Sequence, residues 1–168
     1  MRQIVARRIM KLALFSFLLC GAGGVMAQSP HYLKADASLD SDFCYNVALK
    51  EAGLGTVPTV NYSLSATACF VVACATKNGN IVQGQPKSGS GTATTVVPLP
   101  VRNGQTTGIV QLCPGSFSLP NPGCTGNQEQ VILAASYSNV SLSDNLGTPS
   151  PTLPNLSGSL PGFSGTCQ

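Results

Sequence analysis

The sequence is poor in the side chains that most enzymes use for chemistry. It has no tryptophan, one histidine, His31, and only two glutamates, Glu51 and Glu129. Hydrolases with a Ser-His-Asp or Cys-His arrangement need an imidazole held by a rigid scaffold, and His31 lies close to an expected chain end. A glycosidase needs two carboxyl groups facing each other across a cleft, and nothing in the sequence brings Glu51 and Glu129 together. We therefore expect a protein that is not an enzyme.

Charge is scarce as well, at 9% of the residues. From residue 28 onward, five basic residues stand against six acidic ones, which gives a net charge of −1. Nucleic-acid binding draws its affinity from clustered cations, and these five are scattered, so nucleic acid is excluded as an expected partner. An acidic membrane surface is excluded for the same reason.

Long apolar runs are also missing. The longest, residues 12–19, falls short of the ~20 residues that span a bilayer. Basic residues precede this run, and the small-residue exit Val25-Met26-Ala27 follows it, which is the layout of a secretory signal peptide. Cys20 follows Phe17-Leu18-Leu19 and not the small residue of a lipoprotein signal. We expect residues 1–27 to be removed and the protein to be secreted, either to the periplasm or out of the cell, without insertion into a membrane.

Six cysteines remain after this leader, and in an oxidising compartment they are expected to form disulfides and not to bind metal. Cys69 and Cys74 cannot pair if they share one strand, because five residues span about 16 Å and bridged Cα atoms lie within about 7 Å. The same spacing places the two side chains on opposite faces of the strand. The pairs that we predict are Cys74 with Cys124, Cys69 with Cys113, and Cys44 with Cys167. No cofactor is expected.

The rest of the chain is rich in Val, Thr, Ser, Ala and Gly and predicts strands almost throughout. Residues 33–39 and 43–49 alternate between apolar and polar and predict a hairpin, with Leu33 on its apolar face. Residues 59–75 predict the longest strand, in which the loss of alternation from Phe70 to Ala73 indicates burial on both faces or a bulge. Residues 129–143 predict the last strand, with a bulge or a twist near Ser138.

Two Asn-Gly pairs, Asn78-Gly79 and Asn103-Gly104, predict type I′ turns and therefore hairpins. The second pair leads us to expect that the strand at 92–99 pairs with the strand at 106–112. Pro98 places the first of these strands at a sheet edge. Together the pattern predicts an all-β fold: an antiparallel, immunoglobulin-like β-sandwich of about seven strands, stapled by disulfides.

We expect one domain over residues 28–143, followed by a segment rich in Ser, Pro and Gly at 144–168. Such a segment is normally mobile, but a disulfide at Cys167 would attach it to the domain. Asp40, Asp42 and Asp144 could together supply oxygen ligands to calcium. The pattern lacks the rest of any calcium loop, and we favour turn stabilisation by the aspartate side chains.

The order of several short motifs resembles a group of small secreted, uncharacterised β-rich proteins of bacteria and fungi. These motifs lie between residues 32 and 145 and are Lys50-Glu51-Ala52-Gly53-Leu54-Gly55, Asn61-Tyr62-Ser63-Leu64, Ala73-Cys74 followed by Asn78-Gly79, Asn103-Gly104-Gln105-Thr106-Thr107-Gly108, and Tyr137-Ser138-Asn139-Val140. The resemblance supports the pairing of Cys74 with Cys124. The other four cysteines depart from the group, and no activity is carried over from it.

The sequence therefore favours a secreted, non-enzymatic β-sandwich that acts as an extracellular structural, adhesion or interaction module. Its partner would be a protein or a component of the cell surface. A module that binds glycans or a small apolar molecule is the alternative, although sugar-binding faces commonly stack sugar rings on exposed aromatic residues and tryptophan is absent. A hydrolase that uses Glu51 or Glu129 is the third reading.

Overall fold

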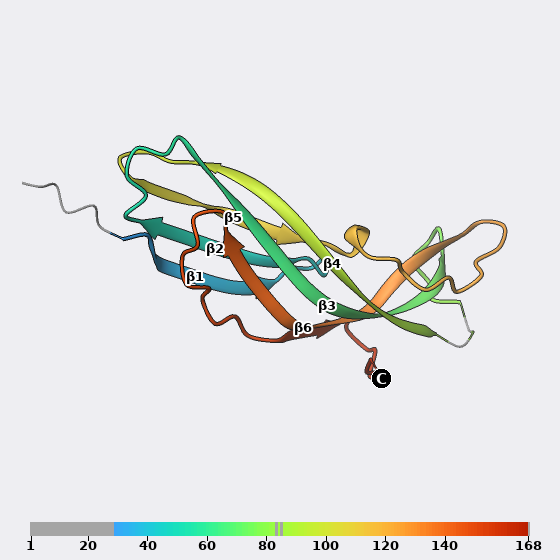
Figure 1. Cartoon of the computed structure of the whole chain (residues 1–168). Helices are drawn as coiled ribbons and strands as arrows, with labels where there is room; N and C mark the ends of the chain where they lie inside the picture. Colours follow the sequence, from blue (N-terminus) through green and yellow to red (C-terminus); the bar gives the residue numbers. More distant parts are fainter. Residues whose placement is uncertain (1–28, 83, 85, 168) are drawn as a thin grey trace, which may run out of the picture.

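Two antiparallel sheets form the fold of this chain (Figure 1). The computed structural model describes residues 29–82, 84 and 86–167, so the expected signal peptide lies outside the described residues. One sheet has three strands, in the order β1 (His31–Leu39), β2 (Tyr45–Ala52) and β5 (Gln105–Leu112). The other has four, in the order β4 (Lys87–Pro100), β3 (Thr59–Thr76), β6 (Gln128–Asp144) and β7 (Leu156–Ser159). The predicted all-β sandwich is confirmed, and the immunoglobulin-like topology stays a prediction.

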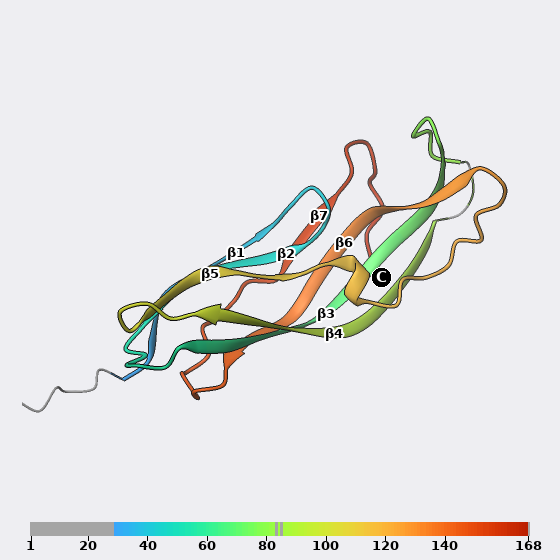
Figure 2. The ribbon, with the colours of Figure 1, turned by 90° about the horizontal axis from the view of Figure 1, so that it is seen from above.

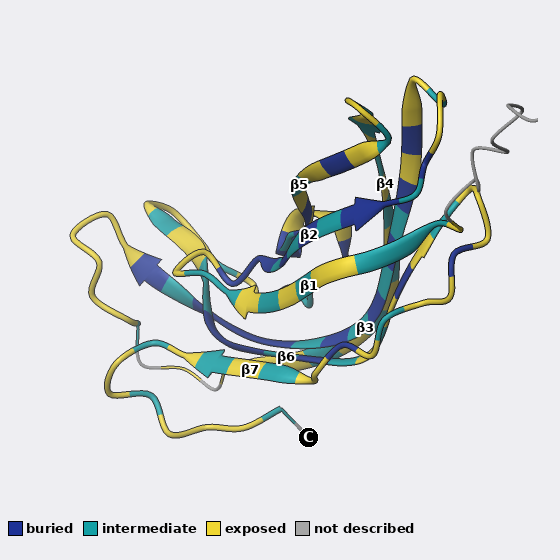
Figure 3. Cartoon of the chain, turned by 90° about the vertical axis from the view of Figure 1, so that its left-hand side faces the viewer, coloured by how far each residue is buried: buried dark blue, intermediate teal, exposed yellow. Residues whose placement is uncertain are grey.

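The core lies between the inward faces of the two sheets, and more and less buried residues alternate along most of β2, β3 and β5 (Figure 3). The predicted inward face of β3 is buried throughout, from Val60 to Phe70. Tyr137 of β6 contacts Tyr45, Phe70 and Phe117, with ring centroids 5.4, 5.9 and 6.0 Å from its own. Edge-to-face packing of this kind adds to the stabilisation that burial alone provides.

The β1–β2 hairpin is confirmed, but the side chains at the start of β1 face other sides than predicted. The register shifts between Tyr32 and Lys34, so Leu33 has no partner on β2 and is 53% exposed. Tyr32 packs against the core in its place. A bulge reverses which side chains point inward, and this is why Leu33 does not share the face of Ala35 and Ala37.

The far half of β3 is buried on both faces, as its loss of alternation predicted. Val71 and Ala73 of β3 and Leu133 and Ala134 of β6 form a second apolar cluster, separate from the main core. The C-terminal segment covers this cluster with Leu160, Phe163 and Cys167. The register also shifts between Val71 and Val72, so burial and a bulge occur together here. Of the two alternatives predicted near Ser138, the bulge is present, with Asn139 at a φ of 51°.

The strands on either side of Asn103-Gly104 do not pair with each other, which corrects our expectation for residues 92–99 and 106–112. β4 pairs with β3, and β5 pairs with β2. Asn103 and Gly104 have φ values of 52° and 70°, the signature of a type I′ turn, but only Arg102 and Gln105 bridge across it. The turn is therefore local, and the chain crosses from one sheet to the other directly after it.

The Asn78-Gly79 hairpin has a different turn from the one predicted. Only Gly79 has a positive φ, 79°, and its N–H donates to the Thr76 carbonyl, which closes a three-residue loop. Pro98 lies on β4, an edge strand, as predicted. The connection between β5 and β6 contains a short 3-10 helix, η1 (Pro114–Ser116).

Three disulfides join distant parts of the sandwich, and only one of our predicted pairs is correct. Cys74 is bonded to Cys124, as expected. Cys44 is bonded to Cys113 and Cys69 to Cys167, so the predicted pairs Cys69 with Cys113 and Cys44 with Cys167 are wrong. Cys44 directly precedes β2 and Cys113 directly follows β5, and the pairing of Tyr45 with Leu112 brings these two cysteines together. Cys69 points instead to the outer face of β3, where the C-terminal segment lies.

Residues 144–167 contribute to the sandwich and are not merely attached to it. Residues 156–159 form β7, which pairs with Ala134–Tyr137 of β6. Leu153 is buried in the main core, and the Tyr45 hydroxyl donates to the Pro154 carbonyl at 2.7 Å. The segment then continues across the second apolar cluster to the disulfide at Cys167.

Candidate functional site

One glutamate is completely enclosed at one end of the sandwich. Glu51 lies on β2 with 0% of its surface exposed. It continues the inward series Tyr45, Val47, Leu49, so the alternation of β2 itself points this carboxyl group into the interior. Tyr32 is its partner on β1, and Tyr62 and Asp144 form a matching pair in the other sheet. Two cross-strand pairs therefore meet across the interior.

Hydroxyl groups occupy both oxygens of Glu51. The Tyr62 hydroxyl donates to Oε2, and the Thr148 hydroxyl donates to Oε1 at 2.6 Å. Asp144 positions Thr148, because its Oδ1 accepts hydrogen bonds from the backbone N–H groups of Leu146 and Thr148. Tyr32 completes the network by donating to Asp144 Oδ2 at 3.4 Å. A carboxyl group that is fully enclosed and fully paired stabilises the fold and has no access to a substrate.

Burial raises the pKa of the Tyr62 phenol, and the hydrogen bond to Glu51 raises it further. The pKa of Tyr32 is raised by burial and then by the charges of Asp144 and Glu51. Burial also raises the pKa of Tyr45 and Tyr137, and these four are all the tyrosines in the chain. Each phenol is therefore held in its protonated form and acts as a hydrogen-bond donor.

These shifts predict a loss of stability in alkali. Because the tyrosine pKa values are higher in the folded state, their contribution is complete below the unfolded value of about 10 and is lost as the pH rises above it. Tyrosinate absorbance should therefore appear near pH 10 in denaturant and only at higher pH in the native protein. A native titration curve that coincides with the denatured one would contradict the buried network.

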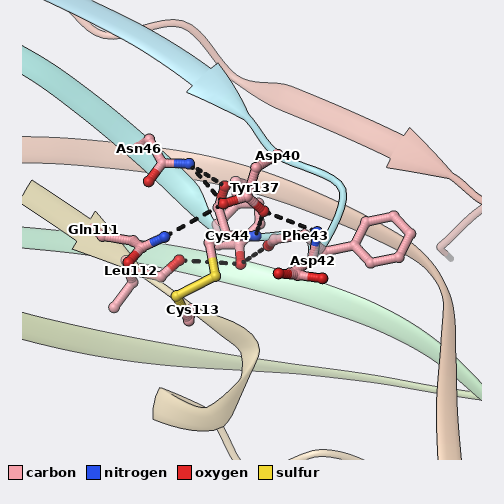
Figure 4. Close-up of a disulfide and its surroundings, with 9 residues drawn as sticks. All are labelled: Asp40, Asp42, Phe43, Cys44, Asn46, Gln111, Leu112, Cys113 and Tyr137. Atoms are coloured by element: carbon pink, nitrogen blue, oxygen red, sulfur yellow. Dashed lines mark hydrogen bonds between the residues drawn. A yellow bond between two sulfur atoms is a disulfide. The ribbon is translucent and has the colours of Figure 1, made fainter. Parts of the chain in front are cut away.

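A second polar cluster lies at the β1–β2 turn (Figure 4). Asp40 accepts hydrogen bonds from the backbone N–H groups of Asp42 and Cys44 at 3.0 and 2.9 Å, and from the side chains of Asn46 and Gln111. These bonds lower the pKa of Asp40, with the largest effect from Asn46. This arrangement agrees with the turn-stabilising role that we favoured over calcium binding.

The carboxyl groups singled out in the sequence do not converge. Asp144 lies beside Tyr32 at one end of β1, and Asp40 follows the other end of that strand, about 25 Å away at the rise of a strand. Glu129 is exposed and pairs with Ala75, about 40 Å along β3 from Tyr62 and Glu51. No three His, Cys, Asp or Glu side chains gather as a metal site in the described ranges. His31 contacts the Ser29 carbonyl at 2.8 Å.

Hydroxyl groups line the half of the outer face of the four-stranded sheet that the C-terminal segment leaves open, and sequence reasoning did not identify them as a surface. In register across β4, β3 and β6 lie the rows Thr94, Ser65, Ser141 and Thr92, Thr67, Ser138. The Ser65 and Thr94 hydroxyls are 2.7 Å apart, and those of Thr67 and Thr92 are 3.3 Å apart. We define these six residues together with Ser63 and Ser143 as the hydroxyl face. The sequence does show Ser and Thr at the outward positions of each strand. It does not show the strand register that aligns them into rows.

A polar hollow of about 390 Å³ lies between the β3–β4 hairpin and the start of β6. It is lined by Thr76, Lys77, Asn78, Thr125, Asn127 and Gln128. Its volume falls within the range of small-molecule sites.

Fold and site together define an all-β sandwich joined by three disulfides. It has an enclosed polar network around Glu51 and an uncharged hydroxyl face on its four-stranded sheet. Comparisons with known proteins found no matching family model, no matching curated protein and no matching solved structure. Within the described residues, no helix has the length and apolar character needed to cross a membrane.

Proposed function

We propose that this chain is a secreted, non-enzymatic module that acts outside the cytosol by surface contact, in a structural, adhesive or interaction role. Three disulfides support export to an oxidising compartment, because such bonds persist there and are rare in the cytosol. The enclosure of Glu51 supports a non-enzymatic role, because both oxygens of this carboxyl group accept hydrogen bonds inside the fold and neither is exposed.

The observation that carries the proposal is the hydroxyl face. Between residues 61 and 76 of β3, 88 and 100 of β4, and 130 and 143 of β6, the sequence has no charged residue. Hydroxyls that bond across strands hold their positions, so the face offers ordered donors and acceptors to a neutral partner. Long-range electrostatic attraction plays little part on such a face, and contact would depend on fit and hydrogen bonding.

Retention on washed cells or extracellular matrix of the source culture tests this function. The double variant Ser141→Lys/Ser143→Lys places two charges on exposed positions of the hydroxyl face and should release the protein into the culture fluid. Thr107→Lys, at an exposed position of β5 in the other sheet, is the control and should be retained like the wild type. Equal retention of both variants would exclude the hydroxyl face, and turnover of a substrate by the purified protein would overturn the proposal.

The alternative is a ligand-binding module, which the polar hollow beside Lys77 favours by its volume. A glycan array read with wild type and with Lys77→Ala would distinguish it. Binding that is lost in Lys77→Ala and kept in Ser141→Lys/Ser143→Lys would assign the function to the hollow.

A further inference from the structure

The free edge of β4 presents a row of unpaired backbone groups. The N–H of Val101 donates to the Pro58 carbonyl, so odd-numbered residues of β4 point their backbone groups towards β3. Even-numbered residues point theirs away from it, and Thr106 reaches one of them by donating to the Pro100 carbonyl. Within the described chain, no backbone hydrogen bond outside the β3–β4 ladder involves the segment 88–96. Its outward groups belong to Ser88, Ser90, Thr92, Thr94 and Val96.

Two prolines bound this row symmetrically. Pro86 and Pro98 have the same parity as the outward residues, and each lies six positions from Thr92. Neither has an N–H to donate, so hydrogen bonding along the edge can extend only between them. An antiparallel copy of the same segment, centred on Thr92, would place Ser90 opposite Thr94 and Ser88 opposite Val96. In this register, both prolines of each copy fall outside the paired segment.

We propose that two copies of this chain associate through β4, each adding its segment 88–96 to the free edge of the other. The pairing follows a two-fold axis at Thr92 and joins the two four-stranded sheets into one. The prolines set the register, because a two-fold axis at Thr92 keeps them outside the paired segment in both copies. A second copy fits this edge, because two identical uncharged strands meet without like-charge repulsion. The edge is 14 residues long, and β4 lies at the margin of the molecule with β3 on its one paired side (Figure 2).

Charge also favours pairing of identical strands. The segment 88–96 has no charged residue. Lys87 is the one charged residue of β4, and the two copies of Lys87 would lie at opposite ends of the joined pair. The three other edges are less suited. β1 carries the exposed ion pair of Lys34 and Asp36, β7 has only four residues, and β5 has eight, one of which, Thr106, already bonds to the end of β4. Charges, prolines and short lengths are the devices that prevent edge-to-edge association, and on β4 they are confined to its ends.

Two substitutions at the centre of the edge test the pairing. Thr92→Pro removes an N–H that β3 does not use, and Thr92→Lys places like charges side by side on the two-fold axis. Each should raise the dimer dissociation constant at least about tenfold in sedimentation up to about 1 mM protein. Ser141→Lys, on the same outer face but away from the edge, is the control and should dimerise like the wild type. If Thr92→Pro fails to fold, Thr92→Lys still decides the question.

Amide exchange read by NMR tests the register independently. Protection of Ser90, Thr92 and Thr94 should rise with protein concentration. Gly91 and Ala93 should be protected at every concentration, because their amides bond to β3. A monomer at all concentrations, or a dimer in which the even-numbered amides still exchange freely, would overturn the proposal. Thr92 belongs to the hydroxyl face, but the two proposals have separate readouts. Retention on cells tests the proposed function, and the dimer dissociation constant tests the pairing of β4.

Discussion

Replacing Glu51 by alanine should lower the free energy of unfolding by about 3–5 kcal/mol. The substitution leaves the hydroxyls of Tyr62 and Thr148 without an acceptor in a site that water does not reach, at about 1–3 kcal/mol for each group. It also opens a cavity where a fully enclosed side chain had packed, which adds to the loss. Denaturant unfolding monitored by circular dichroism measures the effect.

Glu129→Ala is the matched control, because Glu129 is the only other glutamate and is exposed on β6. It should change the free energy of unfolding by less than about 0.5 kcal/mol. Glu51→Gln keeps one acceptor oxygen and should fall between the two. Equal effects of Glu51→Ala and Glu129→Ala would show that the enclosed network does not stabilise the fold. The same variants bear on the hydrolase reading, which requires an activity that depends on one of these carboxyl groups.

Removing the Cys69–Cys167 disulfide should have the other large effect. The bond closes a loop with a sequence separation of 98, and chain entropy alone assigns it about 4–5 kcal/mol. In the variant Cys69→Ala/Cys167→Ala, the C-terminal segment loses its anchor beside Leu133 and Ala134. We expect a lower denaturation midpoint and faster proteolysis beyond residue 160. Denaturant unfolding and limited proteolysis measure these changes.

The variant Cys74→Ala/Cys124→Ala is the control for this prediction. It also loses one disulfide and should be destabilised by a similar amount, about 4 kcal/mol for a sequence separation of 50. Its C-terminal segment should nevertheless stay resistant to protease, because Cys69 and Cys167 remain bonded. Peptide mapping without reduction tests the connectivity directly, and a peptide pairing Cys69 with Cys113 would contradict the structure.

Local patterns in the sequence predicted the strands and the core well. Alternation from Val60 to Phe70 gave the buried face of β3 correctly, because a strand with one apolar face has only one register that buries it. Alternation failed at Leu33, where one extra residue in the β1–β2 ladder reverses the faces. A bulge of this kind depends on the partner strand and leaves no mark in the sequence.

Long-range relations were mostly beyond prediction. The Asn103-Gly104 turn was identified correctly, but a tight turn fixes only its own residues and not the sheet that each flanking strand joins. The disulfide of Cys44 with Cys113 follows from the pairing of β2 with β5, which we had not predicted. Within the candidate site, the parity of Glu51 with Val47 and Leu49 could have indicated its burial. Its contact with Thr148, 97 residues away, had no signal of its own.

The disulfide at Cys167 also determines how far the protein can stretch. A pulling force between residues 29 and 167 leaves the chain at Cys44, crosses to Cys113, follows residues 113–124, crosses to Cys74, and reaches Cys167 through Cys69. This path contains fewer residues than the direct one from Cys44 to Cys69, so the rest of the chain is shielded from tension. Only residues 29–44, 69–74 and 113–124 can be drawn out, which is about 110 Å at about 3.5 Å per residue. Under mechanical load, the molecule therefore extends only a short distance, and most of its residues bear no force.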